Sequence, residues 1–305
     1  MSATWTLVLA GGDGTRLAPV TRRGDGAVVP KQFCRLTGPR SLLEQTLDRA
    51  DRISGRDRTV CVVTSKHSRW WSEQLGDRAL DNVVVQEANR GTAAGVLLPI
   101  AHILRRDPDA TIVILPSDHH FADEDTFVRA IRRGVEASRA QPQRILLMGI
   151  VPERPETDYG WILPATDHDG APARVACFVE KPPRHRAQEL MSAGGLWSPF
   201  VLIGKASAFR DIFARSAPDL LQRVEARVAE ERQGILYRNA DLPELDFSGS
   251  ILQAAADRLR VMPVPACGWS DVGTPERLRA CQQELPRERQ RSARVVVETG
   301  TRAQV

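Results

Sequence analysis

The chain has 305 residues, of which 42% are hydrophobic and 26% are charged, so it can bury the core of one large α/β domain or of two small ones. Its net charge of +4 is scattered among acidic neighbours, which disfavours nucleic-acid binding and suits a pocket for anionic metabolites. The five cysteines lack C-x-x-C spacing, and no apolar run approaches the roughly 18 residues of a membrane span. We therefore expect a cytoplasmic protein with reduced thiols and no membrane partner.

Over the first 150 residues, short apolar runs that predict buried strands alternate with stretches long enough for helices. The strands are expected at residues 6–9, 59–63, 82–85, 111–115 and 144–150, and the helices at 41–50, 92–105 and 125–140. This alternation predicts a mainly parallel sheet that is covered by helices on both faces.

Beyond residue 150 the pattern changes to strands separated by glycine and proline, which predicts an added mixed-sheet region with a second ligand. The strands are expected at residues 159–163, 174–179, 196–203 and 260–264, and a last helix at 274–283. We expect one domain over residues 1–284, with two halves that meet near residue 150, and a short tail over 285–305.

The most informative segment is the glycine-rich turn Gly11-Gly12-Asp13-Gly14-Thr15-Arg16, which directly follows the first apolar run. Glycine permits positive φ and lets backbone N–H groups turn toward an anion, and Arg16 and Lys31 add two cations. A dinucleotide-binding fingerprint would need glycine where Leu17 stands, and a Walker A loop would need Gly-Lys-Ser/Thr. The turn therefore predicts a polyphosphate site. The alternative is a tight strand-to-helix turn with a solvated arginine.

Two carboxylates follow predicted strands, where open α/β sheets bind ligands. Asp118 comes after the strand at 111–115, and Asp271 lies between Gly268 and Gly273, which we expect to let the backbone approach a ligand. Because Mg²⁺ prefers carboxylate and phosphate oxygens, the two aspartates can share one ion if their loops converge. The alternative for Asp118 is a helix or turn cap. A zinc site at His119 and its neighbour lacks further ligands at suitable spacing.

A second ligand is indicated by Phe178-Val179-Glu180-Lys181-Pro182, where a lysine ends an apolar strand. Lys181 offers a point charge for a phosphate, and Glu180 can accept hydrogen bonds from sugar hydroxyls. The alternative is a surface ion pair. The turn at Tyr159-Gly160 adds a glycine that can let a sugar ring approach the backbone.

Taken together, these motifs resemble the sugar-nucleotidyltransferase family over roughly residues 5–282. The matching segments are Leu9-Ala10-Gly11-Gly12 through Pro19, Pro30-Lys31-Gln32-Phe33, and residues 115–119, 154–160, 178–182 and 268–273. Pro30-Lys31-Gln32-Phe33 favours the mannose-1-phosphate guanylyltransferase branch over the thymidylyl and uridylyl branches. The resemblance implies an α/β, Rossmann-like three-layer sandwich with a mainly parallel mixed sheet. It also implies Mg²⁺ and the synthesis of GDP-mannose and pyrophosphate from GTP and mannose 1-phosphate.

The resemblance also implies a role for each matching residue, with the nucleotide bound in the half before residue 150 and the sugar phosphate in the half after it. The nucleotide would contact Leu9, Ala10, Gly11, Gly12, Gly14, Thr15, Gln86, Asn89, Thr92, Ala93 and Ser117. The catalytic cations Arg16 and Lys31 would bind its phosphates, and Asp118 and Asp271 would hold Mg²⁺. The sugar phosphate would contact Tyr159, Gly160, Glu180, Lys181 and Ser198.

Four positions depart from the family pattern: Gln86 replaces a glutamate, Glu87 a proline, Gly91 an asparagine, and Ser198 an asparagine. A carboxylate can accept from both N1–H and N2–H of guanine, whereas a glutamine amide cannot. Two alternatives therefore stay open: the same chemistry with another base or sugar 1-phosphate, and a non-catalytic regulatory relative that binds sugar nucleotides. A dinucleotide-dependent oxidoreductase is disfavoured by the missing third glycine. The sequence leaves a homodimer open.

Overall fold

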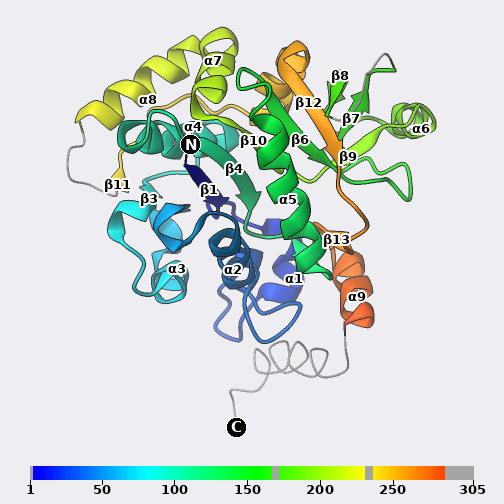
Figure 1. Cartoon of the computed structure of the whole chain (residues 1–305). Coiled ribbons are helices and arrows are strands. Elements are labelled where there is room, and N and C mark those ends of the chain that lie inside the picture. The colour runs from blue at the N-terminus through cyan, green and yellow to red at the C-terminus, as the bar shows by residue number, and fades with distance from the viewer. Residues whose placement is uncertain (1–2, 167–171, 231–235, 286–305) are drawn as a thin grey trace.

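A computed structural model describes residues 3–166, 172–230 and 236–285, and its centre is an eleven-stranded mixed sheet (Figure 1). Along the sheet the strands follow the order β11 (Leu236–Tyr237), β3 (Val83–Gln86), β2 (Thr59–Thr64), β1 (Thr4–Leu9), β4 (Thr111–Pro116), β10 (Leu202–Lys205), β6 (Ile145–Gly149), β12 (Leu259–Pro263), β8 (Ala173–Val179), β7 (Gly160–Pro164) and β9 (Leu196–Ser198). From β11 to β4 all neighbours are parallel, as are β6 and β12, and the other pairs are antiparallel. The predicted α/β fold class is confirmed.

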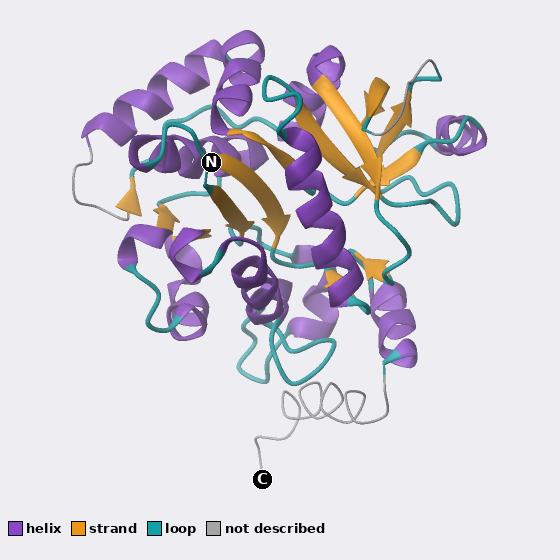
Figure 2. Cartoon of the chain, viewed as in Figure 1, coloured by secondary structure: helices purple, strands orange, loops and turns teal. Residues whose placement is uncertain are grey.

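Helices cover both faces of the parallel part of the sheet (Figure 2). One layer contains α4 (Gly91–Arg106), α7 (Ala206–Ser216) and α8 (Pro218–Glu230), and the other α2 (Leu42–Ser54), α3 (Ser68–Leu75) and α5 (Glu124–Ser138). Strand β1 shows why both layers form: Leu7 packs into the core under α4 and the next residue, Val8, into the core under α2. Alternating side chains of a strand point to opposite faces, so an unbroken apolar run needs cover on both.

The structure has three further helices: α1 (Ala18–Thr21), α6 (Arg184–Ser192) and α9 (Pro275–Glu284). All the strands and helices expected from the sequence are found, with ends shifted by a few residues, except at 196–203. Helices α1, α3, α6, α7 and α8 were not expected. In the part of the chain that is described, no helix is both long and apolar enough to cross a bilayer.

The single strand expected over residues 196–203 is wrong, because the structure has two strands there. β9 pairs with β7, whereas β10 lies between β4 and β6. Pro199 separates them and has no N–H to donate, and Phe200 has a φ of 54°, which no extended strand contains. The chain therefore turns between two parts of the sheet.

The division into two halves at residue 150 stays a prediction. Strands from both sides of that residue interleave in one sheet, since β10 and β12 flank β6. Residues 286–305 of the expected tail lie outside the described residues.

Candidate functional site

A cavity of about 340 Å³ lies at the carboxyl ends of β1 and β4, where the glycine-rich turn meets the β7–β9 region. It brings together most of the residues singled out by the sequence. Those that line it are Leu9, Gly11, Gly12, Arg16, Thr92, Ser117, Asp118, Tyr159, Gly160, Glu180, Lys181, Ser198 and Asp271. Ala10, Gly14, Thr15, Lys31, Gln86, Asn89 and Ala93 are not among its lining residues.

The two predicted metal ligands are brought together by a short antiparallel pair of strands, β5 (His120–Phe121) and β13 (Trp269–Ser270). β5 begins two residues after Asp118, and β13 ends directly before Asp271. The backbone N–H of Ala122 continues the ladder by donating to Gly268 O at 3.1 Å. This pairing makes the two loops converge although they are far apart in sequence.

The glycines beside Asp271 are required by contacts within the protein, and their close approach to a ligand stays a prediction. Gly268 has a φ of +61°, and a Cβ there would lie 2.6 Å from the Cβ of Ala122. A Cβ on Gly273 would lie 2.2 Å from Asp271 Oδ2. Gly268 thus permits the β5–β13 pairing, and Gly273 leaves room for the carboxylate.

Lys31 connects the two aspartate loops from behind the cavity. Its Nζ lies 3.1 Å from Asp118 Oδ2 and donates to the carbonyl oxygen of Asp271 at 2.6 Å, and only 8% of its side chain is exposed. Gly14, with a φ of +60°, packs against it, because a Cβ on Gly14 would lie 2.9 Å from Lys31 N. The absence of a side chain at Gly14 therefore leaves room for the backbone of Lys31, and the Lys31 ammonium contacts both carboxylate loops.

Asp118 is ionised and is the more accessible of the two carboxylates, with 33% of its side chain exposed. Burial alone would raise its pKa, but the ammonium of Lys31 holds the pKa below its ordinary value. Burial lowers the pKa of His119, whose Nδ1 lies 3.2 Å from the indole nitrogen of Trp269. Because the indole N–H can only donate, His119 accepts there as a neutral ring.

Asp271 is 8% exposed and is surrounded by donors. Its Oδ1 accepts from the Tyr159 hydroxyl at 2.8 Å and from Gly273 N at 3.1 Å, and Arg277 Nη1 lies 3.1 Å from Oδ2. Burial and the Asp271 charge raise the pKa of Tyr159, so the phenol stays protonated as a donor.

The sequence analysis missed Arg277, a residue of α9 whose side chain is 11% exposed. Besides Asp271, its guanidinium contacts Glu156 at 2.8 Å and Asp158 at 3.4 Å, and it lies 4.6 Å from the centre of the Tyr159 ring. Arg277 is thus the shared counter-ion of three carboxylates.

The donor set fits Mg²⁺ only together with phosphate oxygens of a substrate. Within residues 3–166, 172–230 and 236–285, no three His, Cys, Asp or Glu side chains form a metal-binding group. Asp118 is open to the cavity, whereas both oxygens of Asp271 already accept hydrogen bonds. Mg²⁺ in phosphate-transfer enzymes is commonly held by one or two carboxylates plus substrate phosphates, which matches this arrangement. A zinc site gains no support.

The predicted sugar-phosphate residues lie together on the β7–β9 side of the cavity. Glu180 Oε1 lies 3.4 Å from Lys181 Nζ, and burial raises the pKa of Glu180. A Cβ on Gly160 would lie 2.8 Å from Glu180 Oε2, so the glycine leaves room for Glu180, and its contact with a sugar ring stays a prediction. Arg16, at the other side, is 55% exposed and lies 3.4 Å from Asp158.

Backbone strain concentrates at this cavity. Among the described residues, three that are not glycine have positive φ: Lys181 at 44°, Phe200 at 54° and Val272 at 46°. Lys181 and Phe200 line the cavity, and Val272 follows Asp271. Such conformations cost about 1–3 kcal/mol each and cluster at functional sites, which supports a binding role here.

The segment that contains the predicted nucleotide contacts Asn89, Thr92 and Ala93 is attached to a segment to which the sequence analysis assigned no role. Ala93 is buried, with its N–H bonded to Leu245 O at 3.0 Å, and the Thr92 hydroxyl donates to Asp246 at 3.0 Å. Gly91, with a φ of +78°, is required because a Cβ there would lie 2.4 Å from Leu245 O. Asn89 is exposed and accepts from the N–H of Gly91 at 3.1 Å.

That segment contributes Asp246 and Ser248 to the cavity wall. Asp246 Oδ1 accepts from Gly249 N at 2.6 Å and so caps the π-helix Ser248–Leu252. The polar run Asp246-Phe247-Ser248-Gly249-Ser250 before apolar Ile251 carries the signature of a helix start, and that signal could have located it. π-Helical turns are often found at functional sites.

The remaining predicted residues, Ala10 and Thr15, lie on either side of the glycines of the turn. Ala10 is buried, with its N–H bonded to Val62 O at 2.8 Å, and Thr15 begins the 3₁₀ turn Thr15–Leu17. Gln32, which the sequence analysis did not assign, lines the cavity and donates to Gly12 O at 2.6 Å.

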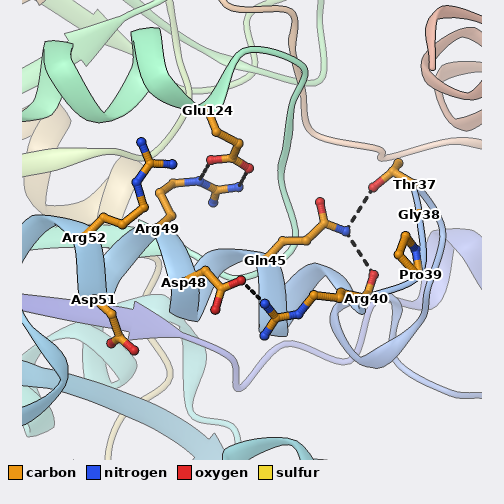
Figure 3. Close-up of a pocket in the computed structure, with 10 residues that line it drawn as sticks. All are labelled: Thr37, Gly38, Pro39, Arg40, Gln45, Asp48, Arg49, Asp51, Arg52 and Glu124. Atoms are coloured by element: carbon orange, nitrogen blue, oxygen red, sulfur yellow. Dashed lines mark hydrogen bonds and ion pairs between the residues drawn. The ribbon is translucent and has the colours of Figure 1, made fainter. Parts of the chain in front are cut away.

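Another cavity, of about 490 Å³, lies beside α2 (Figure 3), and none of the predicted site residues line it. Its charged side chains all have partners: Arg49 donates to both oxygens of Glu124 at 2.7 Å, and Arg40 pairs with Asp48. Asp51 and Arg52 pair with Arg78 and Asp125, which do not line the cavity. Because these charges are already satisfied, the cavity beside β1 and β4 is the stronger functional candidate.

The chain is similar to known proteins over most of its length. A family model described as nucleotidyl transferase matches residues 5–288. An Escherichia coli K12 mannose-1-phosphate guanylyltransferase is 30% identical over 90% of this chain and 58% of its own length. The alginate biosynthesis protein AlgA of Pseudomonas fluorescens is 32% identical over 88% of this chain and 56% of its own. The chain thus spans little more than half the length of these curated relatives.

A solved structure gives the same result for the fold. The Thermus thermophilus protein described as a mannose-1-phosphate geranyltransferase has a TM-score of 0.75 and is 30% identical, with 88% of this chain and 76% of its own covered. The similarity therefore extends over nearly all of the described chain.

Proposed function

The chain belongs to the nucleotidyl transferase family, and from this premise we propose that it transfers a nucleotidyl group from a nucleoside triphosphate to a sugar 1-phosphate. One observation carries the proposal: a single cavity joins the glycine-rich turn, the Lys31-linked aspartate loops and the Glu180–Lys181 pair. The first two suit a triphosphate and the third a sugar phosphate. A reaction between two anions needs such a set of positive charges on both sides.

For the substrates we propose GTP and mannose 1-phosphate, with GDP-mannose and pyrophosphate as products. The support is the name of the Escherichia coli relative, a mannose-1-phosphate guanylyltransferase, together with Pro30-Lys31-Gln32-Phe33. Because the identity is only 30%, product identification has to decide the base and the sugar.

The nucleophile is a phosphate oxygen of the sugar phosphate, which is already ionised at neutral pH, so no general base is required. It attacks the α-phosphorus, and the bond to the pyrophosphate oxygen breaks. Lys181, with 61% of its side chain exposed, can follow the sugar phosphate, and the exposed Arg16 can bind the leaving pyrophosphate. Asp118, and Asp271 after exchange of a hydrogen bond, would hold Mg²⁺, which neutralises phosphate charge when bound.

The test is a matrix of nucleoside triphosphates and sugar 1-phosphates with purified protein and Mg²⁺, read as pyrophosphate release and by mass spectrometry of the product. We expect release with GTP and mannose 1-phosphate, and none from a matched Asp118→Ala protein. Release with another pair would retain the chemistry and correct the substrates. Tight nucleotide binding without release from any pair would overturn the proposal in favour of a regulatory sugar-nucleotide-binding protein.

A further inference from the structure

The side-chain amide of Asn239 is fixed in orientation by the backbone of Ala88. Asn239 is fully buried; its Oδ1 accepts from Ala88 N at 2.9 Å, and its Nδ2 donates to Ala88 O at 2.8 Å. Because a backbone N–H only donates and a carbonyl only accepts, these two bonds determine which end of the amide is oxygen and which is nitrogen.

Asn239 in turn fixes the orientation of Gln86. The Asn239 Nδ2 group has a second hydrogen, which it donates to Gln86 Oε1 at 3.2 Å. The two residues lie side by side because β11 pairs with β3 in parallel, with Tyr237 opposite Gln86. Since the oxygen of Gln86 faces Asn239, its Nε2 faces the opposite way.

That direction leads to the glycine-rich turn. A Cβ on Gly11, which lines the cavity, would lie 3.3 Å from Gln86 Nε2, and one on Gly95 would lie 3.7 Å away. Within the described chain, no residue accepts a hydrogen bond from Gln86 Nε2, although only 3% of the residue is exposed. Gln86 Nε2 is therefore a donor that is free to bond a ligand in the cavity that supplies an acceptor.

We propose that Asn239 is a positioning residue that makes Gln86 a hydrogen-bond donor to the base, so that the site selects keto bases over amino bases. The inference rests on the proposed function, because it assigns the nucleotide to this cavity. Guanine, uracil and thymine present a carbonyl oxygen where adenine and cytosine present an amino group. An amino group would place two donors against each other, whereas a carbonyl oxygen completes the bond.

The inference also explains how guanine can be accepted without the family's glutamate. Gln86 would contact O6 of guanine and leave its N1–H and N2–H groups to other partners. The consequence is weaker discrimination between GTP and UTP, since O6 and O4 are both acceptors.

The experiment uses the full-length protein and compares GTP, UTP, ATP and CTP, both by kcat/KM with mannose 1-phosphate and by calorimetric Kd without the sugar. The wild type should prefer the keto pair by roughly 10- to 100-fold, the factor expected when a buried donor is left unpaired. In Asn239→Asp, the new carboxylate can accept from Gln86 Nε2, and Gln86 then turns its oxygen toward the cavity. The keto-to-amino ratio should fall at least tenfold, mainly through KM and Kd.

Asp241→Asn is the matched control, since Asp241 lies in the same segment but pairs outside the cavity with Arg227 at 2.6 Å. Its ratio should equal that of the wild type. A wild type that binds ATP as tightly as GTP, or an Asn239→Asp protein that loses all four nucleotides equally, would overturn the inference. Absence of pyrophosphate from every pair would instead defeat the proposed function, and the calorimetric ratios would still test the role of Asn239.

Discussion

The ammonium of Lys31 lies 3.1 Å from the carboxylate of Asp118, with only 8% of the lysine side chain exposed. A buried, paired lysine is expensive to desolvate and is retained where its charge has a task. Here the charge lies between the loop that follows β4 and the loop that follows β13, because Lys31 also bonds the carbonyl oxygen of Asp271. The pair therefore joins the glycine-rich turn to both predicted metal ligands.

Replacing Lys31 should lower kcat and raise the pKa of Asp118. We expect Lys31→Met to lower kcat by roughly 10²–10³, the usual loss when one preorganised charge is removed. The pKa of Asp118 should rise, because the charge that lowers it is gone. The control is Lys205→Met, measured by the same steady-state kinetics. Lys205 is the last residue of β10 and donates to Asp109 O. Equal kcat in the two variants would remove Lys31 from the mechanism.

Substitution of Arg16 tests its role on the triphosphate side of the cavity without a change in protein stability. Because 55% of its side chain is exposed, Arg16→Ala should leave the melting temperature within about 2 °C of the wild type. Its kcat should nevertheless fall by roughly 10²–10³. Arg279→Ala, at a 66% exposed ion pair on α9, is the surface control and should retain full activity. Normal turnover in Arg16→Ala would assign leaving-group binding elsewhere.

The sequence predicted those parts of the site whose signals are local. A glycine-rich turn after an apolar strand and a carboxylate at a strand end are recognisable without a partner. Arg277 and Asn239 carry no such signal: Arg277 contacts Asp158 over 119 positions, and Asn239 contacts Gln86 over 153. Their importance comes from tertiary contacts, which no spacing rule contains.

The glycines show the same limit of prediction from sequence. Gly160 and Gly268 were expected to admit a ligand, and the structure shows in addition that Glu180 and Ala122 lie where their missing side chains would be. A sequence shows that a side chain is absent, but only the fold shows what takes its place. The broken strand at Pro199 was visible in the sequence, since proline within a predicted strand argues against its continuation.

The shared counter-ion Arg277 should be important for stability. Arg277→Met leaves Glu156, Asp158 and Asp271 without the cation between them, and breaking such a buried pair typically costs about 3–5 kcal/mol. We expect this loss in the free energy of unfolding measured with urea. Mg²⁺ should raise the unfolding midpoint of the variant more than that of the wild type, because it replaces the missing charge. Arg277→Lys, which retains the charge without the planar fork, should lie between the two.

An unchanged free energy of unfolding in Arg277→Met would show that the three carboxylates are solvated well enough without it. A midpoint that responds to Mg²⁺ as the wild type does would separate the stabilising role of Arg277 from the cation site.

The last prediction concerns pH. Burial lowers the pKa of His102 below 6.5, and its neutral ring bridges two partners: Nδ1 lies 2.8 Å from the Tyr237 hydroxyl and Nε2 lies 2.8 Å from Asp81 O. Because a carbonyl only accepts, Nε2 carries the proton and Nδ1 accepts from Tyr237, a bond whose direction protonation would reverse. The unfolded chain then binds the proton more readily, so this contribution to stability is present above pH 6.5 and is lost as the pH falls below it. His102→Gln should flatten the decline in urea-derived stability between about pH 6.5 and 5, by at most about 1.4 kcal/mol per pH unit. A decline as steep as in the wild type would assign the acid sensitivity to other groups, first of all His67, whose pKa burial also lowers.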